Sequence, residues 1–239
     1  MMHSGFLRAA TMAAVLAGGV ALAEEADGLT PLFDGKSVDG WIQRGGKALY
    51  TVEDGCLVGK TVLKEPNSFL CPPKEYGDFV LEYEYKVNPK LNSGVQIRSQ
   101  CFAEAKVLDN AKDAKGKALK VAAGRVHGYQ VEIDNDPAKA RFWAGGLYEE
   151  GCRGWIYPGF GGGDSKAFTA QGAKLTKVDD WNKVRIECRG SSIKTWLNGE
   201  ARADVKDDRV AKGFIGFQVH GSKDAGMDVR WRNIRIKEL

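Results

Sequence analysis

The chain has 239 residues, and 35 Lys and Arg residues against 31 Asp and Glu residues give it a formal charge of +4. An excess this small, with the lysines scattered along the chain, argues against a nucleic-acid-binding protein. After residue 23 no apolar run approaches the roughly 18 residues of a membrane helix, so we expect no membrane span.

Residues 1–23 have the pattern of a secretory signal peptide. Arg8 gives a basic start, a stretch rich in Ala, Val and Leu follows, and Ala21-Leu22-Ala23 forms an A-x-A cleavage site. No cysteine stands next to the apolar stretch, which argues against a lipid anchor. We therefore expect a periplasmic or secreted protein, cleaved near Ala23, whose mature part is one domain over residues 24–239. Its formal charge would be +3, because the removed segment holds one arginine and no acid.

Five cysteines remain in the mature chain, and none of them forms a C-x-x-C pair, which argues against a zinc or thioredoxin-like site. Disulfides form in exported proteins, but an odd count leaves at least one thiol without an intrachain partner, and the spacing does not fix the pairing. Cys188 occupies an apolar position of a strand pattern, so we interpret it as a small buried hydrophobe. The five are Cys56, Cys71, Cys101, Cys152 and Cys188.

The first clear strands lie at residues 78–87 (DFVLEYEYKV) and 93–99 (SGVQIRS). Both alternate side chains that should face a core with side chains that should not, and Gln96 and Arg98 fall on the second set. Residues 102–123 follow and are the one stretch that resembles a helix, because they are rich in Ala and Lys. Gly116 and a weak period argue against a regular helix, so we interpret this stretch as a surface insertion between two strands.

Residues 128–136 (GYQVEIDND) form a strand pattern with an unusual polar face. Tyr129, Val131 and Ile133 alternate as a buried face should. The residues of the opposite face are Gln130, Glu132 and Asp134. An amide and two carboxylates in a row either face water or line a site.

The last third of the chain continues the strand signals. Residues 158–172 are rich in glycine but do not open a helix after a strand, so we predict a loop and not a phosphate cradle. Asn198-Gly199 is a strong hairpin-turn signal. The further strand patterns lie at residues 182–190, 192–201, 213–221 and 227–239. Many short antiparallel strands with alternating faces predict an all-β fold, a two-sheet sandwich or jelly roll.

Three strands carry groups with directional hydrogen bonds on the face turned away from the core, each beside a glycine. These groups are Gln96, Arg98, Gln130, Glu132, Asp134, Gln218 and His220. Sugars need such donors and acceptors, together with an aromatic ring over their C–H faces. The candidate rings are Trp41, Trp143, Tyr148, Trp155 and Tyr157. Taken singly, each ring fits core packing better, and each polar residue fits a solvated strand face or a surface ion pair. The coincidence of three strands favours a carbohydrate site.

With these residues in hand, the chain resembles the 3-keto-disaccharide hydrolase family along nearly all of its mature length. The stretches that carry the resemblance are LFDGKSVDGW, YTVEDGCLVG, YGDFVLEYEYKV, NSGVQIRS, HGYQVEID, GGLYEEGCRGWIYP, WNKVRIECRG, TWLNG, GFIGFQVHG and RWRNIRIKEL. The resemblance implies a concanavalin A-like jelly-roll sandwich of two antiparallel sheets. It also implies an enzyme that hydrolyses glycosides oxidised at C3.

A carbonyl at C3 acidifies the proton on C2, so a base can remove that proton while donors or a metal stabilise the enolate oxygen. Elimination of the C1 substituent and addition of water then give net hydrolysis. On this interpretation Glu132 or His220 is the base, and Arg98 and His127 polarise the carbonyl. The expected substrate-binding residues are Gln96, His127, Gln130, Asp134, Tyr148, Arg153, Trp155 and Gln218. No motif specifies a cofactor, and a divalent metal at the enolate is kept as an option. The insertion at 102–123 leaves substrate size open.

Two other functions stay open. The stretch EIDND resembles the strand motif of concanavalin-like β-glucanases, in which Glu132, Asp134 and Asp136 would supply a nucleophile and an acid/base of a retaining enzyme. Against it, an aspartate stands where that motif has a glutamate, and Pro137 ends the strand. A non-catalytic carbohydrate-binding module on the same fold is the third function class.

Overall fold

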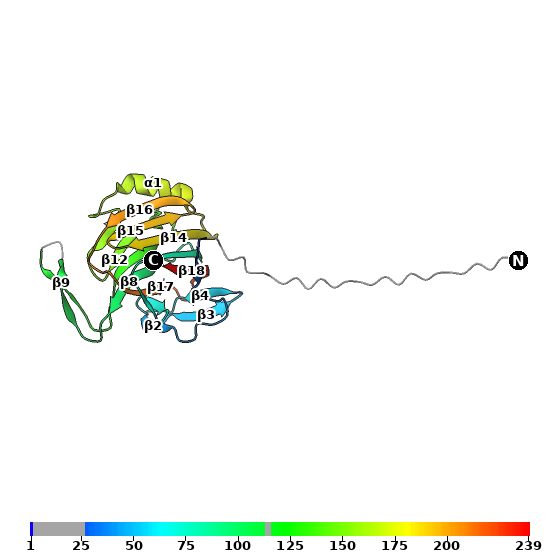
Figure 1. Ribbon diagram of the computed structural model, residues 1–239, viewed down its shortest axis with the longest axis horizontal. Coiled ribbons are helices and arrows are strands. Elements are labelled where there is room, and N and C mark those ends of the chain that lie inside the picture. The colour runs from blue at the N-terminus through cyan, green and yellow to red at the C-terminus, as the bar shows by residue number, and fades with distance from the viewer. Residues whose placement is uncertain (2–26, 113–115) are drawn as a thin grey trace.

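The computed structural model describes residues 1, 27–112 and 116–239 and contains two large antiparallel sheets that pack face to face (Figure 1). The all-β fold predicted from strand alternation is therefore confirmed. The predicted signal peptide, apart from Met1, lies outside the described residues. Among the described residues, no helix is long and apolar enough to cross a bilayer.

The first sheet collects strands from both ends of the chain. Its strands are β1 (Thr30–Pro31), β3 (Leu49–Glu53), β4 (Cys56–Lys60), β7 (Phe79–Val87), β14 (Asn182–Arg189), β15 (Ser192–Leu197), β16 (Glu200–Lys206) and β18 (Asp228–Glu238). They lie in the order β16-β15-β14-β7-β18-β4-β3, and β1 pairs with β18. The predicted turn joins β15 to β16, with φ of 52° at Asn198 and 92° at Gly199, as a two-residue hairpin requires.

The second sheet contains the strands with the polar faces. Its strands are β2 (Ile42–Gly45), β5 (Ser68–Cys71), β6 (Glu75–Tyr76), β8 (Ser93–Cys101), β11 (Val126–Ile133), β12 (Leu147–Glu150), β13 (Gly154–Tyr157) and β17 (Gly213–Val219). They lie in the order β13-β12-β11-β8-β17-β5-β2, and β6 pairs with β17. The register places Glu132 of β11 opposite Gly94 of β8, and Gly94 opposite Gln218 of β17.

The apolar faces of the two sheets meet in one core. Tyr83, Tyr129, Phe217 and Trp231 are all at most 1% exposed and belong to a single cluster. The rings of Phe217 in the second sheet and Trp231 in the first lie 5.5 Å apart, edge to face. Aromatic rings of this size bury large apolar areas, which stabilises the sandwich. Because alternate side chains of a strand point to opposite faces, the even-numbered residues 130 and 132 point away from this core.

The described residues of the insertion at 102–123 form two strands and no helix. Strand β9 (Lys106–Lys112) pairs with β10 (Ala118–Val121) in a separate two-stranded sheet, and this hairpin projects from the body of the molecule at the left of Figure 1. Leu108, Ala111 and Val121 form a small buried cluster there. The stretch is an insertion between β8 and β11, as Gly116 and the weak period predicted, and its Ala- and Lys-rich composition gives no helix in the described residues.

The predicted loop at residues 158–172 is half helix. Helix α1 (Ser165–Leu175) begins where the side chain of Asp164 accepts a hydrogen bond from the backbone N of Ala167 at 2.7 Å. That N-cap satisfies a backbone donor that the helix leaves free, and buried Phe168 packs the helix onto the sandwich. The glycines before residue 164 hid this start signal.

All five cysteines are unpaired thiols in the structure. Cys188 is fully buried in the main core, as predicted.

Candidate active site

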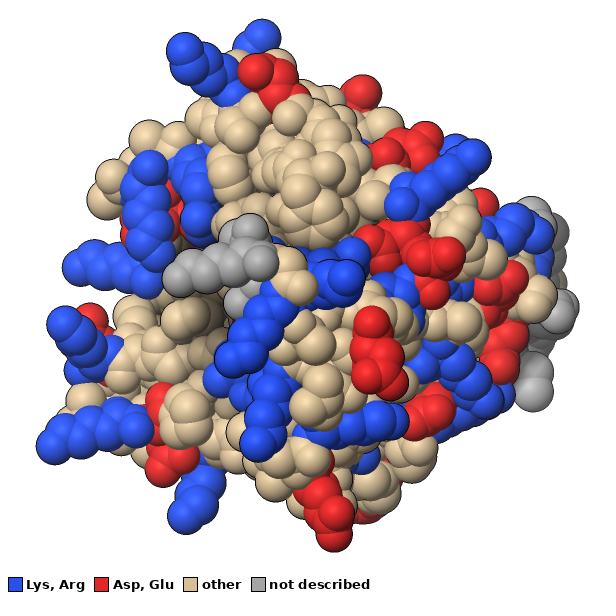
Figure 2. All heavy atoms as spheres, turned by 90° about the vertical axis from the view of Figure 1, so that its left-hand side faces the viewer, with Lys and Arg blue, Asp and Glu red and all other residues tan. Residues whose placement is uncertain are grey.

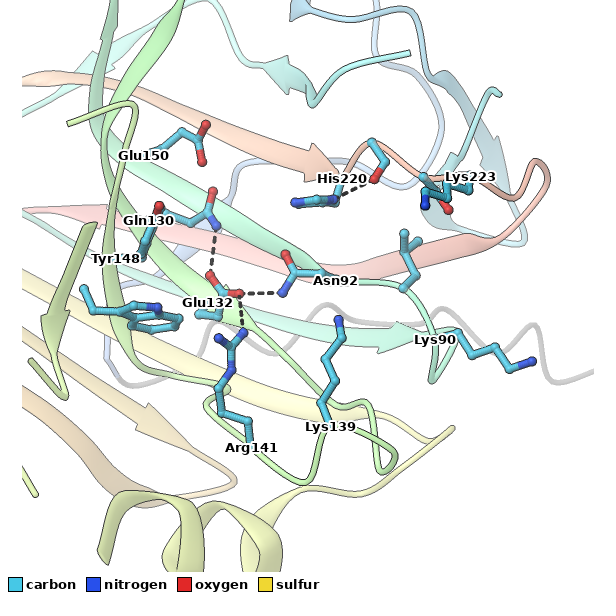
Figure 3. A pocket seen from close by; sticks show the side chains of 14 residues that line it. Lys90, Asn92, Gln130, Glu132, Lys139, Arg141, Tyr148, Glu150, His220 and Lys223 are labelled. Carbon is cyan, nitrogen blue, oxygen red and sulfur yellow. Dashed lines mark hydrogen bonds and ion pairs between the residues drawn. The ribbon is translucent and has the colours of Figure 1, made fainter. Parts of the chain in front are cut away.

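A cavity of about 690 Å³ opens on the face of the second sheet that points away from the core (Figure 3). Strands β11, β12 and β13 supply one side of it, and the loops before β8, after β11 and after β17 supply the rest. The residues that line it are Lys90, Leu91, Asn92, Gln130, Glu132, Lys139, Arg141, Tyr148, Glu150, Trp155, His220, Gly221, Ser222 and Lys223. This size suits a small polar ligand such as a disaccharide.

Glu132 lies at the centre of the cavity wall and is only 4% exposed. The side-chain amide of Asn92 donates to Glu132 Oε1 at 2.5 Å, and that of Gln130 donates to Oε2 at 3.0 Å. Both carboxylate oxygens are therefore held by amide N–H groups. A carboxylate fixed in this way has a defined direction toward any molecule in the cavity.

A chain of hydrogen bonds behind the cavity ends at Glu132. The hydroxyl of Ser99 lies 2.5 Å from Gln96 Oε1, and the amide nitrogen of Gln96 donates to Gln130 Oε1 at 2.6 Å. Because Gln130 Oε1 accepts from Gln96, its amide nitrogen must face Glu132. The dipoles of this relay all point their positive ends toward the carboxylate, so they stabilise its ionised form.

Burial acts in the opposite direction and is the larger effect. Desolvation raises the pKa of Glu132 to about 7, against a usual 4.5. The hydrogen bonds from Asn92 and Gln130 lower this pKa. The charge of Asp134 raises it and the charge of Arg141 lowers it, but each of these effects is smaller than desolvation. A carboxyl group with a pKa near 7 exchanges protons readily at neutral pH, which is the property of a general base or acid.

We expect this pKa to make stability depend on pH. Between about pH 4.5 and 7 the folded protein holds a proton on Glu132 that the unfolded chain releases, so stability falls as pH rises through this window and levels off above it. Glu132→Gln has no such proton to lose, so between about pH 4.5 and 7 its unfolding free energy should rise by about 3 kcal/mol relative to that of wild type. Urea denaturation at several pH values measures this; a difference that is constant with pH would contradict the raised pKa.

Arg141 stands beside Glu132 in the loop after β11. Its Nε donates to Asp134 Oδ2 at 2.5 Å, and its Nη2 lies 4.0 Å from Glu132 Oε1. The guanidinium also lies over the rings of Trp143 and Trp155, at 5.0 and 5.1 Å from their centroids. These contacts orient the group, while its two terminal nitrogens have no hydrogen-bond acceptor among the described residues. They can bind an oxygen atom of a ligand.

His220 follows β17 and reaches over the cavity from the side opposite Tyr148 (Figure 3). Its Nδ1 lies 2.7 Å from the carbonyl oxygen of Gly221. A carbonyl can only accept, so Nδ1 donates and the neutral ring keeps a free lone pair on Nε2. Glu150 also lines the cavity, and burial raises its pKa, while Arg125 and His220 lower it.

Two rings form an aromatic wall beside Glu132. Tyr148 and Trp155 line the cavity and meet edge to face, with centroids 5.2 Å apart. Trp143 packs behind Trp155 at 4.5 Å, which fixes the indole plane. A sugar C–H face can rest on such a wall. Trp41 and Tyr157 instead pack against the main core.

Gly94 leaves the space in which Gln130 reaches Glu132. A Cβ at this position would lie 2.6 Å from Cγ and Cδ of Gln130. We expect Gly94→Ala to displace the Gln130 amide and to lower kcat by roughly tenfold, because a misplaced catalytic group loses rate steeply. Gly77→Ala is the matched control, since its nearest contact would be 3.6 Å. Kinetics of both variants test this, and an unchanged kcat for Gly94→Ala would show that the relay does not position Glu132.

The structure corrects the predicted placement of Arg98. Arg98 has a φ of 46°, at a point where the pairing of β8 with β17 is irregular, and its side chain points away from the cavity. The guanidinium donates to the carbonyl oxygens of Gly77 and Gly190 and to Asp78 Oδ1, at 2.7, 2.7 and 2.8 Å. Buried to 1% exposure, it ties the second sheet to the turns of the first. We therefore assign it no contact with substrate.

His127 and Arg153 also lie away from the cavity. The His127 ring packs on Phe102 at 4.8 Å and is fully buried, because the bulge at Gly128 changes its direction. Arg153 forms ion pairs with Glu149 and Asp207. Neither lines the cavity, so the expectation that they contact substrate is not supported by their positions.

The remaining predicted residues lie in or under the cavity. Glu132, His220, Gln130, Tyr148 and Trp155 line it. Gln96 and Asp134 lie one layer behind, where they hold Gln130 and Arg141. Gln218 is fully buried on the face of β17 that points away from the core, and its amide has no hydrogen-bond partner among the described residues.

Sequence reasoning missed residues that loops bring to the site, among them Asn92, Arg141 and the lysines at 90, 139 and 223, and also Glu150. Pairing residues 147–150 with residues 126–133 would have shown Glu150, because Tyr148 lies opposite Gln130 in the observed register. The loop residues have no such periodic signal. In the described part of the chain, no group of three His, Cys, Asp or Glu side chains is arranged to hold a metal ion.

Fold and site together define a jelly-roll sandwich protein with a polar, aromatic-walled cavity on one sheet. The chain belongs to the 3-keto-alpha-glucoside-1,2-lyase-like domain family, whose sequence profile matches residues 28–237. A curated relative, the 3-keto-disaccharide hydrolase of Bacteroides thetaiotaomicron, is 25% identical over 90% of this chain and 80% of its own length.

Solved structures support the fold. A candidate glycosyl hydrolase from Parabacteroides distasonis superposes with a TM-score of 0.57 at 20% identity, over 92% of this chain and 98% of its own. A Bacillus subtilis protein of unknown function with a galectin-like fold superposes with a TM-score of 0.52 at 14% identity, over 84% and 90% of the two chains. The predicted family and jelly-roll fold are confirmed.

Proposed function

We propose that this protein hydrolyses 3-keto-glycosides by removing the C2 proton, eliminating the C1 substituent and adding water. The observation that carries the proposal is Glu132, a buried carboxylate with a pKa near 7 that faces a sugar-sized cavity. The family and the name of the curated relative support the same substrate class.

Glu132 is the base of the first step. Its held carboxylate takes the proton from C2, and the electrons of that C–H bond form an enolate whose charge lies on the C3 oxygen. Arg141 replaces Arg98 and His127 as the donor to this oxygen, because its free guanidinium nitrogens lie beside Glu132. A positive group next to developing oxyanion charge lowers the barrier.

His220 protonates the leaving group in the second step. The enolate returns its electrons, the C1–O bond breaks, and the departing oxygen takes a proton, leaving a C1–C2 double bond conjugated with the C3 carbonyl. His220 lies across the cavity from Glu132, so one group can act at C2 and the other at C1. Water then adds its hydroxyl to C1 and a proton to C2, and the sum is hydrolysis.

The glucanase alternative loses its geometric basis. Of its three carboxylates, only Glu132 lines the cavity. Asp134 is held by Arg141 at 2.5 Å, and Asp136 lies beyond the strand, 3.9 Å from Lys139. A retaining enzyme needs two carboxyl groups on opposite sides of one glycosidic bond.

A substrate comparison tests the proposal. The protein should release the aglycone from a chromogenic 3-keto-glucoside and leave the unoxidised glucoside intact, with and without a metal chelator to detect a divalent metal. Binding of either sugar without turnover would favour a non-catalytic carbohydrate-binding module. Cleavage of the unoxidised glucoside would contradict the proposed chemistry. Export stays a prediction from the sequence.

A further inference from the structure

We propose that the natural substrate carries an anionic oxygen group, such as a carboxylate, sulfate or phosphate, on its leaving group. The group that would bind it is a lysine rim, defined here as Lys90, Lys139 and Lys223. This inference rests on the proposed function, because it specifies the substrate of the same cavity.

The lysine rim comes from three separate loops. Lys90 lies in the turn between β7 and β8, Lys139 in the loop after β11, and Lys223 in the loop between β17 and β18. All three line the same cavity. Figure 3 shows Lys139 reaching into the cavity, whereas Lys90 and Lys223 lie at its end farther from Tyr148.

These charges are poorly compensated by the protein. No ion pair joins Lys90 or Lys223 to a carboxylate in the described part of the chain, and Lys139 has Asp136 at 3.9 Å, the limit of such a contact. Glu150 lies at the other end of the cavity and is paired with Arg125 at 2.6 Å. Three cations around one opening repel each other, and an anion between them would remove that repulsion.

Isolated surface lysines are ordinary, and a neutral disaccharide would not need them. The convergence of three on one cavity is the feature to explain. Lys and Arg side chains also gather around a hollow on the face of the molecule that carries the β9–β10 hairpin (Figure 2). Fields of one sign at a cavity mouth raise the local concentration of ligands of the opposite sign.

The arrangement of the site places the anion on the leaving group. The keto-sugar ring must lie at Glu132, against the wall formed by Tyr148 and Trp155. Two members of the lysine rim, Lys90 and Lys223, lie at the opposite end, where a C1 substituent would extend from a ring bound in this way. Lysine ammonium groups are point charges without the planar fork of arginine, so they can bind a carboxylate, a sulfate or a phosphate alike.

Matched substrates test this inference. We would compare 3-keto-glucosides of 4-hydroxyphenylacetate, of the corresponding phosphonate and of the neutral amide, which share the same phenol leaving group. The anionic substrates should have a kcat/KM about tenfold higher than the amide at about 20 mM salt, mainly through a lower KM, and the preference should shrink at about 500 mM salt. The ratio between carboxylate and phosphonate identifies the favoured anion.

A double variant assigns the effect. Lys90→Gln with Lys223→Gln should bring the ratio of anionic to neutral substrate close to one, whereas Lys166→Gln on helix α1, outside the cavity, should leave it unchanged. Equal kcat/KM values for all three substrates in wild type would overturn this inference and leave the proposed function standing. Turnover of none of them would overturn both.

Discussion

Replacing Glu132 with Gln should lower kcat on a 3-keto-glucoside by at least about 10²-fold. The side chain keeps its size, and Asn92 can turn its amide to meet the new N–H group, so the fold should persist. What disappears is the carboxylate that two amides hold at 2.5 and 3.0 Å in the wall of the cavity. Steady-state kinetics of the variant measure the loss of kcat, and circular dichroism checks that its fold persists.

Two further variants make this result specific. Glu132→Asp keeps the charge but withdraws it from Asn92 and Gln130, so its kcat should lie between wild type and Glu132→Gln. Glu187→Gln makes the same exchange on β14 of the other sheet, where the carboxylate is 30% exposed, and should have no effect. If Glu132→Gln is as active as wild type, the base is another group, and His220 becomes its candidate.

Replacing Arg141 with Met should lower kcat by about 10²-fold, because the enolate oxygen loses its charged donor. Methionine retains the packing on Trp143 and Trp155, so the aromatic wall should remain. Loss of this cation should also move the acidic limb of the kcat/KM profile to higher pH, since Arg141 lowers the pKa of Glu132. Kinetics between about pH 5 and 9 record both effects.

The lysine variant separates charge from shape at the same position. Arg141→Lys keeps the cation but loses the bond from Nε to Asp134 and the planar fork, so its activity should be intermediate. Arg189→Met, on an arginine with 62% exposure on the first sheet, should be neutral. An unchanged kcat in Arg141→Met would show that the carbonyl is polarised by something else.

The sequence predicted the sandwich because strand alternation reports burial directly. Tyr129, Val131 and Ile133 face the core, and the opposite residues Gln130 and Glu132 line the cavity. Period-2 reasoning needs only a regular strand, and β11 is regular between residues 129 and 133.

The same reasoning failed where the strands are irregular. Arg98 was expected beside Glu132, but its φ of 46° turns the side chain toward the first sheet. His127 lies on the other side of the bulge at Gly128. A bulge shifts every later side chain by one position. Gly128 is itself a bulge signal, because an isolated glycine inside a strand pattern often marks one, whereas no glycine or proline stands next to Arg98 to mark the irregularity there.

Loop residues could not be predicted for a different reason. Asn92 and Arg141 reach Glu132 from the connections before β8 and after β11, and the positions of their side chains depend on tertiary contacts. Arg141 is placed by Asp134 and two tryptophans. Such contacts leave no periodic trace in a sequence.

The fate of the hydrogen at C2 tests the proposed elimination most directly. A 3-keto-glucoside deuterated at C2 should lose its label to solvent during turnover by wild type, because elimination must break that bond. The product is analysed by mass spectrometry at low conversion. An enzyme-free sample and the Glu132→Gln variant, treated in the same way, show how much deuterium is lost by spontaneous exchange. Release of the leaving group with a product that lacks deuterium is the predicted result. Full retention of deuterium at C2 would contradict the elimination and point to direct displacement at C1.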